Sequence, residues 1–219
     1  MSNGKRLNAR AKDRPLAIGI AGAGIGGLAL AIALKRKGFD PLVLEKRARG
    51  QVGEEGIFLT LAPNGFNALR GLGLAEAAGA KGVVTTGIEL HNEHGKRLGL
   101  IDYTAHAEAF GAPSVTIKRG VLNETLLEAA LAEGIDVRFG HAVDGLSEDE
   151  DGITVSAGSE SMQFDVLVAA DGLRSAVRRL ALPHLPKPVF NGLVVALGAV
   201  LHPDDHPTQL LDQGSLRSP

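Results

Sequence analysis

The sequence contains no cysteine and no tryptophan, and aromatic residues make up only 4% of its 219 positions. The absence of cysteine excludes a disulfide scaffold, thiolate-ligated zinc or iron–sulfur, a thiol nucleophile and a redox-active dithiol. It suits a reducing cytosol, so a cytoplasmic location is expected. Neither charge dominates, because 23 basic and 25 acidic residues leave a net charge of −2. This balance gives no reason to expect a nucleic-acid partner.

Glycine, in contrast, is abundant. It occupies 29 of the 219 positions, about twice its usual share. Hydrophobic residues are 44% and charged residues 22%, which is typical of a globular protein with a sizeable core. The length fits one large domain, or one domain and part of another. The glycine excess predicts many tight turns and places where backbones approach closely.

The N-terminus pairs a basic stretch with an apolar one. Residues 1–14 carry five basic side chains, and residues 16–34 carry no charge. This arrangement is similar to a signal peptide or a membrane helix. The apolar run, however, contains five glycines, each of which costs about 1 kcal/mol in a helix interior. Its periodicity also changes from that of a strand to that of a helix. We therefore expect a basic flexible tail over 1–14 and no membrane span.

The apolar run is organised as strand, glycine turn and helix. Residues 16–21 form a short, partly β-branched run typical of a buried strand, and a helical pattern starts at Ile25. Between them lies a GxGxxG motif. Its first glycine permits a tight turn, its second lets a pyrophosphate approach the backbone, and its third lets the helix pack closely on the strand. The helix N-terminus then offers backbone amides to an anion. The glycines of this segment are Gly22, Gly24, Gly26 and Gly27.

A second apolar strand, over 41–45, ends in Glu45, 23 residues after the first glycine of the motif. An acid at this position accepts hydrogen bonds from ribose hydroxyls in dinucleotide-binding folds. Together the strand, glycine turn, helix, strand and acid predict a site for the ADP moiety of NAD or FAD. The motif alone leaves both cofactors open.

The rest of the chain alternates between strand and helix patterns. A hairpin is expected over 83–101, around a turn at 92–95. Helices are expected at 63–72, at 119–133 and from Ser175, and strands at 114–118, 136–139, 152–156, 164–170 and 191–201.

Three further segments carry a family resemblance. They are Glu45-Lys46-Arg47, then Arg119 at the start of a helix, and finally Asp171-Gly172 with Ser175 and Arg178 in a DGxxSxxR pattern. With the glycine motif, they resemble the N-terminal part of FAD-dependent monooxygenases of the aromatic-hydroxylase type.

The resemblance implies an α/β fold. A Rossmann-like FAD-binding domain with a parallel sheet is expected over 15–180, with inserted strands of about 83–118 reaching toward the substrate side. Residues 181–219 are expected to be the start of a truncated substrate-covering sheet and a tail.

The resemblance also implies roles for particular residues. Arg47 and Arg119 match arginines that contact FAD, a role that suits the planar guanidinium fork, and Lys46 lies beside them. Asp171 matches an aspartate near the cofactor phosphates. Since phosphate would repel a carboxylate, its expected role is to cap the following helix at the turn that Gly172 permits.

In the family that the sequence resembles, NAD(P)H reduces the flavin and O2 adds to give a flavin C4a-hydroperoxide, which hydroxylates a small aromatic or other hydrophobic substrate. The cofactor carries this chemistry, so no protein nucleophile is required. No metal is expected, since two His pairs lack the further ligands that a metal site needs. These pairs are His91 with His94 and His202 with His206.

Members of that family are substantially longer, so activity of this chain alone is an open question, and a second chain or an oligomer is a possible partner. Two alternatives remain. One is a non-catalytic nucleotide-binding fragment or subunit. The other is a small NAD(P)-dependent reductase, although the sole tyrosine, Tyr103, lacks a lysine four positions later.

Overall fold

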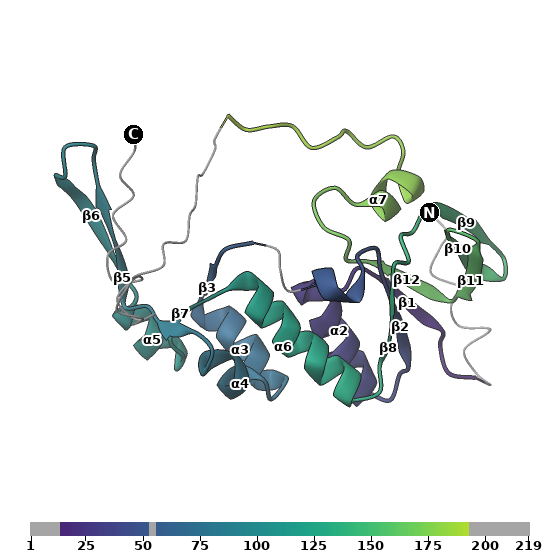
Figure 1. Cartoon of the computed structure of the whole chain (residues 1–219), viewed down its shortest axis with the longest axis horizontal. Coiled ribbons are helices and arrows are strands. Elements are labelled where there is room, and N and C mark those ends of the chain that lie inside the picture. The colour runs from purple at the N-terminus through teal and green to yellow at the C-terminus, as the bar shows by residue number, and fades with distance from the viewer. Residues whose placement is uncertain (1–13, 53–55, 193–219) are drawn as a thin grey trace. The chain divides into compact units, whose positions relative to one another are not determined.

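The computed structural model describes residues 14–52 and 56–192, which fall into two units (Figure 1). The first unit is discontinuous in sequence, because it joins the residues up to Val52 to Leu126–Gly192. The second unit contains the described residues between these stretches. The division falls within helix α6 (Arg119–Ala132), whose first half belongs to the second unit and whose second half belongs to the first.

The first unit is built on a parallel sheet with the strand order β12-β1-β2-β8. Ile20 lies at the centre, in register with Val43 on one side and Val168 on the other. Such short apolar runs are typical of strands that are covered on both faces. The sequence predicted three of these four strands within one or two residues. Their bounds are Ile18–Ala21 for β1, Pro41–Glu45 for β2, Asp136–Phe139 for β8 and Val166–Ala169 for β12.

Different layers cover the two faces of this sheet (Figure 1). Helix α2 (Ile25–Arg36) follows β1 and buries Leu28 and Ile32, and an ion pair between Arg36 and Glu133 ties its end to the end of α6. The opposite face carries an antiparallel sheet, where the Phe164 ring packs so closely on Gly19 that a Cβ there would lie 2.9 Å from it. The strands of this sheet are β9 (Gly145–Asp149), β10 (Gly152–Ala157) and β11 (Glu160–Phe164).

One strand prediction needs correction. The sequence pattern predicts a single strand over 164–170, but the chain changes sheets at Asp165, leaving antiparallel β11 and joining parallel β12. Asp165 fixes this change, because its carboxylate binds the Arg14 guanidinium and the Ala17 amide while its own amide donates to Ala17. Periodicity did not show the break because apolar residues lie on both sides of it.

The second unit contains a small antiparallel sheet with the order β3-β7-β4. At its centre the Thr116 hydroxyl lies 2.8 Å from that of Thr60 and 2.6 Å from that of Thr85. The bounds are Leu59–Leu61 for β3, Val83–Val84 for β4 and Val115–Ile117 for β7, with helices α3 (Pro63–Gly71), α4 (Ala75–Gly79) and α5 (Thr104–Phe110). Helices α4 and α5 and strands β3, β9 and β11 were not predicted as elements of their own.

A separate hairpin joins β5 (Gly87–His91) to β6 (Arg97–Asp102) around the predicted turn at 92–95. The predicted hairpin over 83–101 was too long, because β4 leaves it and pairs with β7 instead. One face of the hairpin is apolar, with Ile88 opposite Ile101 and Leu90 opposite Gly99. These three apolar side chains are exposed. The strand predicted over 191–201 lies outside the described residues from position 193 onward.

Candidate functional site

The glycine motif lies at the carboxyl edge of the parallel sheet, in the loop between β1 and α2. Gly22 adopts a φ of +108°, and its amide donates to the Leu44 carbonyl at 2.7 Å. A Cβ on Gly22 would lie 2.6 Å from the Ala170 carbonyl oxygen. The turn therefore requires glycine both for its backbone conformation and for its contact with the strand beside it.

The other glycines of the motif differ in their surroundings. Gly27 is buried, and a Cβ there would lie 2.0 Å from the Gly22 carbonyl oxygen, so only glycine lets α2 begin this close to the loop. Apart from the neighbouring residues and the backbone of α2 itself, no atom lies within 4 Å of a Cβ placed on Gly24 or Gly26. Gly24 is the N-cap of α2 and provides no side-chain cap for the first turn. The start of α2 is thus an open surface of backbone amides, which suits an anion.

Glu45 ends β2 next to this loop and is only 3% exposed. One carboxylate oxygen accepts from the Ala23 amide at 2.7 Å and the Arg47 Nη2 at 3.2 Å. The other accepts from the Arg47 amide at 2.9 Å and its Nε at 2.8 Å. Burial is the largest single influence on the pKa and acts to raise it, but the hydrogen bonds from Arg47 and Ala23 together outweigh it and hold the pKa below its ordinary value.

The two basic residues after Glu45 therefore have different positions. The Arg47 side chain is mostly buried against Glu45, at 17% exposure, whereas Lys46 is exposed. Strand β8 supports the same corner, since the His141 amide donates to the Glu45 carbonyl and the Gly140 amide to the Arg47 carbonyl.

The Asp171-Gly172 turn follows β12, whose neighbour in the sheet is β1, so it lies at the same edge as Gly22. The expected capping role is confirmed, because Asp171 Oδ2 accepts from the Ala176 and Val177 amides at the start of α7 (Ala176–Ala181). Asp171 Oδ1 is buried and has no hydrogen-bond partner among the described residues. Gly172 adopts a φ of +84°.

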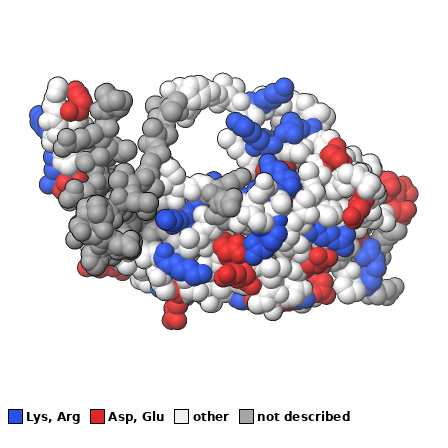
Figure 2. Space-filling view, in the orientation of Figure 1, with Lys and Arg blue, Asp and Glu red and all other residues white. Residues whose placement is uncertain are grey.

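Ser175 and Arg178 complete this turn. The Ser175 hydroxyl caps α7 by accepting from the Arg178 amide at 2.8 Å. The Arg178 guanidinium donates to the Leu173 carbonyl, within the turn itself. Lys and Arg gather around α7, whereas the two charges are mixed over the rest of the face that Figure 2 shows.

Arg119 belongs to the second unit, where it is the first residue of α6. Its side chain passes Gly56, whose φ is +80°, and a Cβ on that glycine would lie 3.0 Å from the Arg119 Cδ. The structure therefore brings together, within the first unit, nine of the ten predicted site residues: the four motif glycines, Glu45, Lys46, Arg47, Asp171 and Gly172.

Sequence reasoning missed Ala23 and His141, which contact Glu45 through their backbone amides. A backbone amide is the same in every residue except proline, so the residue type gives no signal. Only the place of these residues in the sequence could have indicated their contacts. Ala23 lies inside the glycine motif, and His141 follows a strand that was predicted at 136–139.

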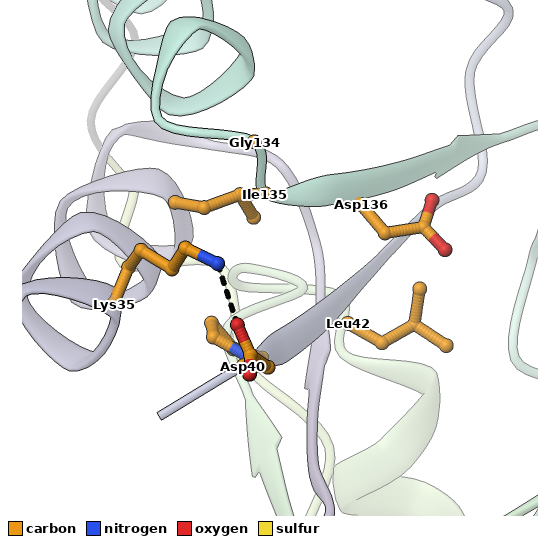
Figure 3. A pocket seen from close by; sticks show the side chains of 7 residues that line it. Lys35, Asp40, Leu42, Gly134, Ile135 and Asp136 are labelled. Carbon is orange, nitrogen blue, oxygen red and sulfur yellow. Dashed lines mark hydrogen bonds and ion pairs between the residues drawn. The ribbon is translucent and has the colours of Figure 1, made fainter. Parts of the chain in front are cut away.

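A small cavity of about 190 Å³ lies elsewhere in the first unit (Figure 3). It is formed where α2 ends and where β2 and β8 begin, and an ion pair between Lys35 and Asp40 borders it. This is the amino edge of the parallel sheet, opposite the glycine loop, so the cavity is separate from the candidate site.

Each hairpin histidine has an acidic neighbour within its own hairpin, with His91 3.7 Å from Glu89 and His94 3.4 Å from Glu93. Within 14–52 and 56–192, no three acidic or histidine side chains are grouped as metal ligands would be. In the same ranges, no helix combines the length and the apolar character needed to cross a membrane.

The fold and the carboxyl-edge site define a dinucleotide-binding domain of the Rossmann type. Residues 16–190 match the family described as FAD binding domain, and the chain belongs to that family. An ADP-containing cofactor fits the residues present, because the first turn of α2 is open and a buried, ionised Glu45 lies beside it.

Curated relatives agree with this assignment. The chain is 35% identical over 178 residues to the aurachin C monooxygenase/isomerase of Stigmatella aurantiaca, covering 81% of this chain and 45% of the relative. It is 34% identical over 172 residues to the 3-hydroxybenzoate 6-hydroxylase of Klebsiella oxytoca, covering 77% and 43%. The chain thus spans less than half the length of these two relatives.

Solved structures show the same partial overlap. The tetrameric form of 2-methyl-3-hydroxypyridine-5-carboxylic acid oxygenase has a TM-score of 0.67 and 25% identity, over 77% of this chain and 43% of that one. Klebsiella pneumoniae HpxO complexed with FAD and uric acid has a TM-score of 0.63 and 28% identity, over 74% and 41%. FAD is therefore the cofactor of the family to which this chain belongs.

Proposed function

We propose that this chain is the FAD-binding part of a monooxygenase that uses NAD(P)H and O2 to hydroxylate a small aromatic substrate. The observation that carries the proposal is the family match over residues 16–190, which includes the whole carboxyl-edge site. The names of the relatives, such as 3-hydroxybenzoate 6-hydroxylase, support the substrate class.

The residues of the first unit have defined parts in this proposal. The first turn of α2 faces the pyrophosphate, Glu45 accepts hydrogen bonds from the adenosine ribose, and Asp171 holds the second turn through the cap of α7. Lys46 contributes positive charge toward the cofactor phosphates. The contact of Arg119 with FAD stays a prediction from the family resemblance. Bound FAD supplies the redox chemistry, and the protein positions it and excludes water.

The visible spectrum of the purified chain tests the cofactor assignment. Addition of FAD should give a protein-bound flavin spectrum, and Gly24→Val and Glu45→Gln should each weaken FAD binding. Gly71→Ala, at the exposed end of α3 in the second unit, serves as a control, because that glycine has no positive φ and no close contact at the position of a Cβ. A chain that binds NADH but not FAD would instead support the small-reductase alternative.

Turnover requires a separate measurement. Oxidation of NAD(P)H with release of peroxide by the FAD-loaded chain would show that this part alone reacts with reductant and O2. If FAD binds but no NAD(P)H is consumed, the chain acts as a nucleotide-binding part that needs further polypeptide.

We also propose that additional polypeptide, present in the longer relatives, covers the apolar face of the hairpin. Two strands with an exposed apolar face are marginally stable alone. Ile88, Leu90 and Ile101 are 36%, 44% and 44% exposed. Light scattering should show concentration-dependent association of this chain that Leu90→Lys reduces. A wild-type chain that stays strictly monomeric at high concentration would contradict this proposal. A defined tetramer would indicate that other copies of this chain cover the apolar face.

The cytoplasmic location is likewise a proposal. It is supported by the absence of cysteine and by the proposed use of a nicotinamide reductant. Fractionation of cells that express the protein tests it, and recovery from a secreted fraction would contradict it.

A further inference from the structure

Protein donors already fill the Glu45 carboxylate. A carboxylate offers about four acceptor positions. Four hydrogen bonds reach Glu45, from the amides of Ala23 and Arg47 and from Nε and Nη2 of the Arg47 guanidinium. All four donors lie 2.7–3.2 Å from the oxygens. A ribose that binds Glu45 through its hydroxyls must therefore replace donors that are present.

The four donors are not equally replaceable. The Ala23 amide is fixed by the turn at Gly22, and the Arg47 amide by the pairing of its carbonyl with Gly140 beyond β8. The guanidinium is attached through rotatable bonds and remains partly exposed, at 17%. Only the guanidinium can leave without disturbing the strands. It presents two donors to Glu45, and an adenosine ribose also presents two, its 2′- and 3′-hydroxyls.

We propose that the Arg47 guanidinium occupies, in the cofactor-free chain, the acceptor positions on Glu45 that the two ribose hydroxyls take when the cofactor binds. This inference rests on the proposed role of Glu45 as the ribose acceptor. Arg47 is then a positioning residue, which keeps the carboxylate ionised and correctly oriented until the ribose arrives. After the exchange, its charge is released beside the site, where phosphate oxygens can accept from it.

Because Glu45 is buried, its carboxylate needs hydrogen-bond donors before the cofactor binds. Glu45 is 3% exposed, and a buried carboxylate without donors either takes up a proton or destabilises the fold. A protonated carboxyl would offer its acceptors to the ribose less strongly. With Arg47 in place, the acid stays ionised before the cofactor binds, and binding exchanges one set of donors for another.

The proposed exchange predicts how much affinity is lost when the ligand lacks the 2′- and 3′-hydroxyls of the ribose. In the wild-type chain, a ligand without the two hydroxyls leaves Arg47 in place, so Glu45 stays paired and little affinity is lost. In Arg47→Met, the same ligand leaves a buried carboxylate short of two donors. The ratio of the dissociation constants of 2′,3′-dideoxy-ADP and ADP should therefore be about tenfold larger in Arg47→Met than in the wild type.

Isothermal titration calorimetry with these two nucleotides measures the ratio, after thermal unfolding has shown that each variant is folded. Lys37→Met, which removes one positive charge at the far end of α2, should keep the wild-type ratio. If Arg47→Met does not fold, Arg47→Lys provides the measurement, since its single ammonium should give a ratio between wild type and tenfold.

The outcomes are distinguishable. A ratio that is unchanged or smaller in the Arg47 variants, while Glu45→Gln abolishes discrimination between the nucleotides in the wild-type background, would overturn the exchange but keep the ribose role of Glu45. A ratio near one in every protein, including wild type and Glu45→Gln, would overturn the ribose role itself. A larger ratio in the Arg47 variants alone supports the exchange.

Discussion

The contact between Gly27 and Gly22 gives the sharpest test of the glycine loop. Replacing Gly27 by alanine adds one methyl group at a point where it would lie 2.0 Å from a backbone oxygen. Real Cβ atoms essentially never come within 3.0 Å of such an atom, so the loop and the helix must separate by about 1 Å. The obstructing group is backbone in a tight turn and cannot rotate away.

The magnitude follows from two opposing effects. Overpacking of this kind costs about 1–3 kcal/mol, and the fixed backbone partner places Gly27→Ala near the upper end. Alanine recovers roughly 0.5–1 kcal/mol through its better helix propensity. The net loss is about 2 kcal/mol, which lowers the Tm of a chain of this size by about 4–8 °C. Because the loop shifts, FAD affinity should fall at least tenfold.

Gly26→Ala is the matched control for stability, since it adds the same methyl group one residue earlier in the same helix, where nothing beyond its neighbours and the helix backbone lies within 4 Å. Its Tm should equal or slightly exceed that of the wild type. Differential scanning fluorimetry and flavin fluorescence titration measure the two effects. If Gly27→Ala is as stable as Gly26→Ala and binds FAD as tightly as the wild type, the close contact between α2 and the loop is refuted.

Three other predictions concern the first unit. Phe164→Ala removes the ring that covers Gly19 and should cost about 3–5 kcal/mol in urea unfolding, whereas Phe190→Ala, at 70% exposure, should stay within about 0.5 kcal/mol. Asp171→Ala removes the acceptor for two α7 amides and should cost about 1 kcal/mol, with Asp171→Asn retaining much of the stability; equal losses would argue against capping. The lowered pKa of Glu45 stabilises the fold above its ordinary pKa of 4.5, and this contribution is lost as the pH falls through the folded-state pKa. The destabilisation by Glu45→Gln should therefore be largest at neutral pH and shrink below about pH 4.5, and a pH-independent difference would contradict the ionised state.

The sequence predicted the features that depend on local chemistry. The turn at Gly22, the helix from Ile25 and the cap by Asp171 each follow from residues close together in the chain. Long, strongly periodic helices such as α6 were also predicted within about a residue of their bounds.

Features that depend on distant partners were not predictable in this way. The pairing of β4 with β7 separates it from the adjacent hairpin, and no local pattern distinguishes the two outcomes. The sequence does not show whether the Arg47 side chain turns toward Glu45 or toward solvent. Its pairing with Glu45 depends on the buried corner that the residues after β8 help to form. Short, exposed strands such as β9 lack the alternation of apolar and polar residues by which a strand is recognised in a sequence.

The anchoring of Ala17 to Asp165 has a consequence for synthesis of the protein. These residues are 148 positions apart, and β1 gains its second neighbour, β12, only after Asp165 has been made. At about 5–20 residues per second, translation of that interval takes roughly 7–30 s. During this time the apolar segment of β1 has an unpaired edge on the growing chain. The nascent protein therefore carries an exposed strand edge until Asp165 emerges, and slower elongation lengthens this exposure.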